Sequence, residues 1–268
     1  MKNKIINRVI IFALLVIANL TVAQSDTIFL SGFLQGDPLR SENKIEDYKD
    51  FDFSKMWSNT PNDNVYGIIG DEHQRLHIKL ISINKQSSKP TEYFVQGKSM
   101  VKDQLREFSG TIHILEVREV VELHYGVDEE FKDKGIKKQG ILIAEYYFEE
   151  NLNEEKRGIF KGILYSKWYL NKKNKIQYDY IEISSDSYSN NAFIGIWKYL
   201  RSEKEKTCNW GDYRVPKANQ DFDIGAAEFS VSHKYVDQGW LDVILKNKIP
   251  NGAIKEAKSG RNNLIWWK

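Results

Sequence analysis

The sequence is poor in the two residues that most constrain a chain: it holds one cysteine, Cys208, and five prolines among 268 residues. A single cysteine excludes an intrachain disulfide framework, so burial of apolar side chains must stabilise the fold. Cys208 is predicted to be a small buried residue, with a free thiol as the alternative. The sequence also lacks a phosphate-binding loop, a Gly-x-Ser-x-Gly elbow and a dinucleotide-binding fingerprint.

Long apolar runs are missing after the first 23 residues. A basic start over residues 2–8 precedes an apolar stretch over 9–20, and small residues at 21 and 23 precede Gln24. This pattern predicts a cleavable signal peptide over residues 1–23, with an N-terminal anchor helix as the alternative. We therefore expect an exported protein, periplasmic or secreted, with no transmembrane segment after cleavage.

An excess of charge of either sign is also missing once this leader is removed. The leader holds three of the 39 basic residues and no acidic ones, so the other 245 residues carry 36 basic and 37 acidic side chains, a net charge of −1. A nearly neutral chain has no overall attraction to nucleic acid or anionic membrane, and we predict no nucleic-acid partner. Charged blocks, such as Lys102 to Arg106, are interpreted as solvated turns.

What the chain does contain is alternating apolar and polar sequence. Strands are predicted over residues 65–69, 76–83, 93–101, 108–121, 142–148, 158–170, 176–183 and 192–199. Most of the connections have hairpin length, so we expect an all-β, antiparallel fold of about eight strands over 65–200. Residues 24–64 are predicted to form a strand at 27–34 followed by loop, with a short helix around 45–56. Residues 201–268 are expected to be an irregular segment, rich in aromatic, Gly and Asp residues, with a late strand at 240–245, packed on the barrel.

An aromatic-x-Gly-x-apolar pattern occurs on three of these strands. Its copies are Phe108-x-Gly110-x-Ile112, Phe160-x-Gly162-x-Leu164 and Phe193-x-Gly195-x-Trp197. Glycine weakens a strand interior, so its recurrence indicates a sharp bend or a close backbone approach in a closed or strongly coiled sheet.

The phrase Gly195-x-Trp197 resembles the Gly-x-Trp signature of lipocalins and their calycin relatives. In that family the motif lies on the first barrel strand, whereas here about seven predicted strands precede it. The resemblance implies a calycin-like barrel in which Trp197 packs at one end. A barrel of this size can be filled by side chains or can hold one small ligand.

The leading functional hypothesis is a non-enzymatic binding or interaction protein of the cell envelope. Its binding surface is predicted to involve Trp197, Trp210, Tyr213 and Trp240, with a small molecule, a glycan or an envelope protein as partner. A purely structural or inhibitory barrel that docks on another protein is an alternative.

A second hypothesis is a glycan-acting hydrolase. A pair chosen from Asp212, Asp221, Asp223 and Glu228 would act as its carboxylates, and nearby aromatic rings would stack on sugars. The competing interpretation is that these acidic residues cap turns by accepting hydrogen bonds from backbone N–H groups.

No cofactor or metal is predicted. Asn219-x-Asp221-x-Asp223 begins like an EF-hand calcium loop, but Ile224 stands where that loop requires Gly and Ser230 where it requires Glu. His73 and His77 are four residues apart on a strand-like stretch, and no third zinc ligand is evident.

Overall fold

The computed structural model describes residues 29–151, 157–246 and 266–267. The predicted signal peptide lies outside these ranges. The chain divides into two units, the first ending at Pro38. Residues 29–33 of this first unit are helical, where a strand was predicted over 27–34. A short apolar run fits either structure by its pattern alone, which is the reason for the difference.

The second unit begins at Leu39 and contains every strand named here. Its strands are β1 (Val65–Ile69), β2 (Gln74–Gln86), β3 (Lys89–Val101), β4 (Gln104–Glu119), β5 (Ile136–Glu150), β6 (Gly158–Asn171), β7 (Ile176–Tyr178), β8 (Asn190–Tyr199) and β9 (Glu205–Asp212). Its helices are α2 (Ile45–Tyr48) and α3 (Leu241–Lys246), with 3₁₀ turns η1 (Ser54–Ser58), η2 (Asn62–Asn64), η3 (Val127–Glu129) and η4 (His233–Gln238).

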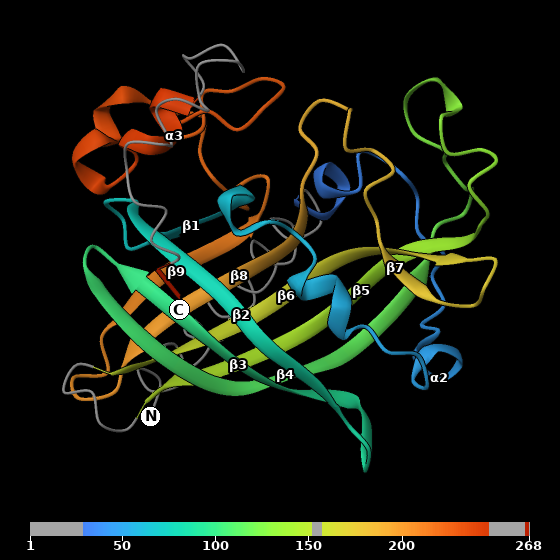
Figure 1. Cartoon of the computed structure of the whole chain (residues 1–268), viewed down its shortest axis with the longest axis horizontal. Coiled ribbons are helices and arrows are strands. Elements are labelled where there is room, and N and C mark those ends of the chain that lie inside the picture. Colours follow the sequence, from blue (N-terminus) through green and yellow to red (C-terminus); the bar gives the residue numbers. More distant parts are fainter. Residues whose placement is uncertain (1–28, 152–156, 247–265, 268) are drawn as a thin grey trace, which may run out of the picture. The chain divides into compact units, whose positions relative to one another are not determined.

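Eight of these strands form a closed antiparallel ring (Figure 1). Their order is β5-β4-β3-β2-β1-β9-β8-β6, and pairing of β5 with β6 completes the circle. The prediction of a mostly antiparallel β fold of about eight strands is therefore confirmed. β7 pairs only with β6 among the described strands and stays outside the ring, and it ends at Tyr178 rather than at 183.

The sequence analysis missed β9, because this strand lies in the segment over 201–268 that was expected to be irregular. It pairs along both edges, with Ile68 of β1 opposite Asn209 and Gly195 of β8 opposite Cys208. Its first three residues are exposed and polar, so no alternation marks it. Pairing on two sides stabilises the extended backbone where local propensity is weak.

The interior of the ring is filled with side chains. Phe193 of β8 stacks on Trp210 of β9 with ring centroids 4.5 Å apart, and Tyr146 of β5 meets the same indole edge-on at 5.1 Å. Phe160 of β6 also lies against Trp210, at 6.1 Å. These rings belong to one cluster of buried residues from β2, β3, β4, β5, β6, β8 and β9, and the partly buried Val65 and Ile69 of β1 pack against it.

The repeated glycines lie where neighbouring backbones approach closely, as predicted. A Cβ on Gly110 would lie 1.8 Å from the carbonyl oxygen of Tyr147, and one on Gly162 would lie 2.1 Å from that of Ile194. A Cβ on Gly195 would lie 2.1 Å from the carbonyl oxygen of Lys161. Only glycine fits these positions without moving the adjacent strand.

One end of the ring is plugged by chain that precedes β1. Met56 and Trp57 of η1 belong to the interior cluster, and Trp57 Nε1 donates to Ser166 Oγ of β6 at 3.0 Å. The Phe53 N–H donates to Tyr93 OH at 3.1 Å. We call this end, where β8 begins and β9 ends, the plugged end. The opposite end, where the β1–β2, β3–β4 and β8–β9 hairpins turn, is the hairpin end.

The segment after β9 covers the outer face of β1. Tyr66 and Ile68 point away from the ring interior and join a second apolar cluster with residues of the C-terminal segment, including Phe222 and Trp240. A late strand was predicted at 240–245, but residues 241–246 form α3. Trp240, Val243 and Ile244 are all buried at a spacing that matches one helical face, which explains the difference.

Candidate functional site

A cavity of about 630 Å³ opens at the hairpin end. It is lined by all three hairpins and by residues from the ends of β5, β6 and β8. Inward-facing residues in the middle of the ring are apolar, but at this end they become polar: Ser99 on β3, Arg106 on β4 and Glu150 on β5 line the cavity. The ring therefore ends in a polar pocket above a filled apolar core.

Glu150 is the most deeply buried acidic side chain of this pocket, at 3% exposure. Its Oε2 accepts hydrogen bonds from the Gly158 N–H at 2.6 Å and from Trp197 Nε1 at 3.3 Å. Its Oε1 lies 3.9 Å from Nε of Arg106, whose side chain is 14% exposed. A buried carboxylate needs a counter-charge and hydrogen-bond donors, and Glu150 has both.

Trp197 forms one wall of the same pocket. It lies opposite Phe160 on β6 and opposite Lys206 on β9. Its indole covers Gly158, where a Cβ would lie 2.2 Å from the ring. The hydrogen bond to Glu150 then fixes the indole N–H, so the ring is held in place from two sides.

Of these pocket-lining residues, the sequence analysis named Trp197 as a binding candidate but did not name Arg106 or Glu150. Arg106 was placed in a solvated charged block, although it has the same strand parity as Phe108 and faces inward with it. Glu150 has the same parity as Phe148 on β5. Extending each apolar stripe by two residues would have identified both.

Asp212, a predicted catalytic carboxylate, lies at the plugged end. Its Oδ2 accepts hydrogen bonds from Thr60 Oγ1 at 2.7 Å, Tyr178 OH at 3.0 Å and Asn191 Nδ2 at 2.7 Å. The residue is 5% exposed. Burial raises the pKa of Asp212 from 3.8 to about 7, although the three donors act in the opposite direction.

The network around Asp212 joins the plug to the ring. Asn191 Nδ2 also donates to the Met56 carbonyl at 2.8 Å, and Asn191 Oδ1 accepts from Ser166 Oγ at 2.8 Å. Ser166 in turn accepts from Trp57 of the plug. A small cavity of about 20 Å³ adjoins Asp212 and Trp57, close to the volume of a single water.

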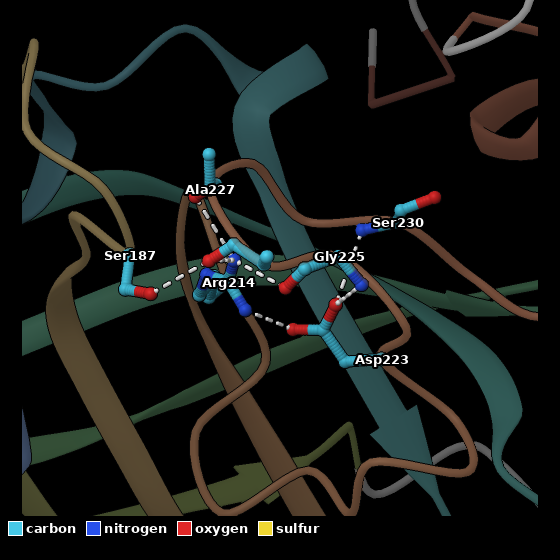
Figure 2. A network of polar contacts seen from close by, with 7 residues as sticks. Ser187, Arg214, Asp223, Gly225, Ala227 and Ser230 are labelled. Carbon is cyan, nitrogen blue, oxygen red and sulfur yellow. Dashed lines mark hydrogen bonds and ion pairs between the residues drawn. The ribbon is translucent and has the colours of Figure 1, made fainter.

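Asp223, a second predicted catalytic residue, belongs to a different network (Figure 2). Its Oδ2 pairs with Arg214 Nη1, and its Oδ1 accepts from the backbone N–H groups of Gly225 and Ser230, both at 3.1 Å. Arg214 Nη2 donates to the carbonyls of Gly225 and Ala227, each at 3.0 Å. Burial raises the pKa of Asp223 against the opposing effect of these bonds. The residues that bind Asp223 in this network differ from the three that donate to Asp212.

The other two predicted carboxylates are exposed. Asp221 pairs with Lys234 on η4. Glu228 lies on the loop whose carbonyls Arg214 holds. The bonds that Asp223 accepts from the Gly225 and Ser230 N–H groups match the turn-capping interpretation.

The four predicted binding aromatics do not form one surface. Trp210 lies in the ring interior, and Trp240 lies in the outer cluster with its ring 4.0 Å from the Arg75 guanidinium. Tyr213 is half-buried and packs edge-on against Tyr188 at 5.2 Å. Of the four, only Trp197 lines the hairpin-end cavity.

The candidate metal and thiol residues have other surroundings. His73 stacks on Phe222 at 4.8 Å, and burial lowers the pKa of His77 to about 4. Cys208 is fully buried, and burial together with the charge of Glu150 raises its pKa well above the ordinary value. Over residues 29–151, 157–246 and 266–267, no three His, Cys, Asp or Glu side chains are grouped to hold a metal ion.

Comparisons with protein-family models, with curated proteins and with solved structures each found no match for this chain. Among the helices that the structure describes, none combines the length and the apolar character needed to cross a membrane.

Proposed function

We propose that the protein is an exported, non-enzymatic binding protein of the cell envelope, built on a calycin-like barrel. Its ligand occupies the hairpin-end cavity rather than the barrel interior. The observation that carries this proposal is the contrast between the two: aromatic rings fill the interior, while a pocket of about 630 Å³ remains at one end. Small-molecule sites have volumes of about 300–1,000 Å³, and this pocket is within that range.

The construction of the pocket supports a binding role. Its floor holds a buried, compensated ion pair between Arg106 and Glu150, and its Trp197 wall is fixed by a hydrogen bond and by packing on Gly158. Side chains fixed in this way lose little conformational freedom when a ligand binds, which favours affinity. Of the four carboxylates of the hydrolase hypothesis, Asp212 accepts hydrogen bonds at the plugged end and Asp223 accepts them in the 223–230 loop.

The site is tested by nuclear magnetic resonance of the full chain with a panel of small probes: sugars, carboxylic acids, amines and aromatic alcohols. The peak of the Trp197 indole N–H is assigned from its loss in Trp197→Phe. We expect binding probes to shift this peak more than the peaks of Trp57 and Trp210. In the Gln104→Trp variant, a larger side chain fills the mouth of the pocket. This variant is expected to abolish the shift, because the probe can no longer enter. Probes that shift only the other indoles would overturn the assignment.

Export is tested separately by N-terminal sequencing of the protein secreted or released from the envelope of the producing cell. The predicted signal peptide requires a chain that begins at Gln24. A chain that stays in the cytoplasm and begins at Met1 would refute this part of the proposal, whatever the result for the pocket.

A further inference from the structure

We infer that the ligand of the hairpin-end cavity is a neutral, polyhydroxylated molecule, namely a short glycan. This inference rests on the proposed function, because it names the ligand class of the same pocket. Three properties of the pocket carry it: the balance of its charges, the kind of its polar groups and the position of its aromatic wall.

The charges of the pocket nearly cancel. Four acidic and three basic side chains line it: Asp71, Glu72, Glu150, Glu205, Lys102, Arg106 and Lys206. The most buried pair, Arg106 and Glu150, is already matched. A charged ligand of either sign would meet like charges at the rim and would compete with an existing ion pair on the floor. A neutral ligand meets neither cost.

The remaining polar groups suit a molecule that carries many hydroxyls. Amide and hydroxyl side chains line the pocket at Gln74, Ser99, Gln104, Thr207 and Gln238. Amides both donate and accept hydrogen bonds, as sugar hydroxyls do, and carboxylates accept from them. Two of these amides already have a partner in the protein: Gln74 Nε2 donates to the Gln238 carbonyl at 2.7 Å, and Gln104 Oε1 accepts from Arg106 Nη2 at 3.2 Å. A fatty acid or another apolar ligand would remove water from the pocket's polar groups without replacing its hydrogen bonds, at a cost for each group.

The Trp197 wall supplies the apolar contact that a sugar ring needs. One face of a pyranose consists mostly of C–H groups, and an indole offers a flat, electron-rich surface for it. Trp197 is half-buried, its N–H is bonded to Glu150, and its ring lies nearly parallel to that of Tyr199, with centroids 6.0 Å apart. The indole therefore has a fixed orientation at the edge of the pocket. Aromatic anchors with a polar handle are enriched at binding sites for this reason.

The experiment is titration calorimetry of the full chain with a panel of neutral di- to tetrasaccharides of α and β linkage. Three comparison probes are trigalacturonate, fully deacetylated chitotriose and dodecanoate. We expect at least one neutral oligosaccharide to bind more than tenfold more tightly than each comparison probe. We also expect its Kd to change less than twofold between 50 and 500 mM NaCl, because no net charge is neutralised.

Variants place the binding in this pocket. Trp197→Ala is expected to weaken the binding more than tenfold and Trp197→Phe less than about threefold, because Phe keeps a flat ring. Tyr147→Ala is the matched control: this side chain is an exposed aromatic on the outer face of β5, and its truncation is expected to leave the Kd unchanged.

The outcomes separate the two proposals. Binding of only trigalacturonate, deacetylated chitotriose or dodecanoate, with a shift of the Trp197 indole peak, would overturn the glycan inference and leave the pocket assignment standing. Glycan binding that neither Trp197 variant weakens would place the glycan elsewhere and overturn the inference. If no probe binds and no Trp197 shift occurs, both proposals are overturned.

Discussion

Asp212→Asn tests the electrostatics of the plugged end. Burial raises the pKa of Asp212 from 3.8 to about 7, so folding favours the protonated carboxyl. The folded protein then binds more protons than the unfolded chain between about pH 4 and pH 7, and its stability falls as the pH rises through that window. At about 1.4 kcal/mol for each pKa unit, the loss attributable to Asp212 is about 4 kcal/mol at pH 8. An amide is nearly isosteric with a protonated carboxyl and does not ionise.

The assay is urea unfolding of the wild type and of Asp212→Asn from pH 4 to pH 8, followed by tryptophan fluorescence. The two proteins should agree within about 1 kcal/mol at pH 4, with the variant more stable by up to about 4 kcal/mol at pH 8. Asp212→Ala is the control. It leaves the donors on Thr60, Tyr178 and Asn191 without their acceptor and should be about 2–4 kcal/mol less stable than Asp212→Asn at every pH. A variant less stable than wild type at pH 8 would show that the ionised carboxylate is stabilised, and would refute the argument.

Three further predictions concern other parts of the fold. Gly162→Ala places a Cβ about 2.1 Å from the Ile194 carbonyl oxygen. Urea unfolding should show a free energy of unfolding that is lower by more than about 3 kcal/mol. A loss below about 1 kcal/mol would contradict the close approach of the two strands. Cys208 should react with a thiol reagent at pH 8 only as fast as the ring opens, because burial raises the pKa of its thiol. A labelling rate in the folded protein equal to the rate in the urea-unfolded chain would contradict this. Arg214→Ala removes the donor to the carbonyls of the 225–227 loop. Amide hydrogen exchange should become faster in this loop, with little change in the ring strands. An equal increase of the exchange rate in both places would contradict a local role.

Most of the ring could be predicted because its strands alternate. On β4, Phe108, Ile112 and Ile114 are buried while intervening residues face solvent, and this period of two is visible in the sequence. The β9 strand could not be predicted in that way. Its exposed half is charged, and its buried half ends in Gly211 and Asp212, residues that are typical of turns.

The candidate site was harder to predict than the fold, since its residues are polar in a position where the pattern is apolar. In the sequence alone, Glu150 and Arg106 cannot be distinguished from ordinary surface charges. Only the strand register shows that the ends of β4 and β5 lie together at the pocket. Trp210 and Trp240 illustrate the opposite error. Large aromatics in an irregular stretch indicated a surface, but both are buried, in two different cores.

The seam between β1 and β9 determines when the chain can fold. Val65 pairs with Asp212, 147 positions further along the sequence. The first strand of the ring therefore cannot complete its pairing until the last strand is present. A ribosome must therefore deliver nearly the whole ring before the circle can close, and closure over so long a loop is slow. Until then β1 and β8 each present an unpaired edge to any neighbouring chain. A copy truncated before Glu205 keeps both edges open permanently, which makes early termination an aggregation hazard rather than a simple loss of function.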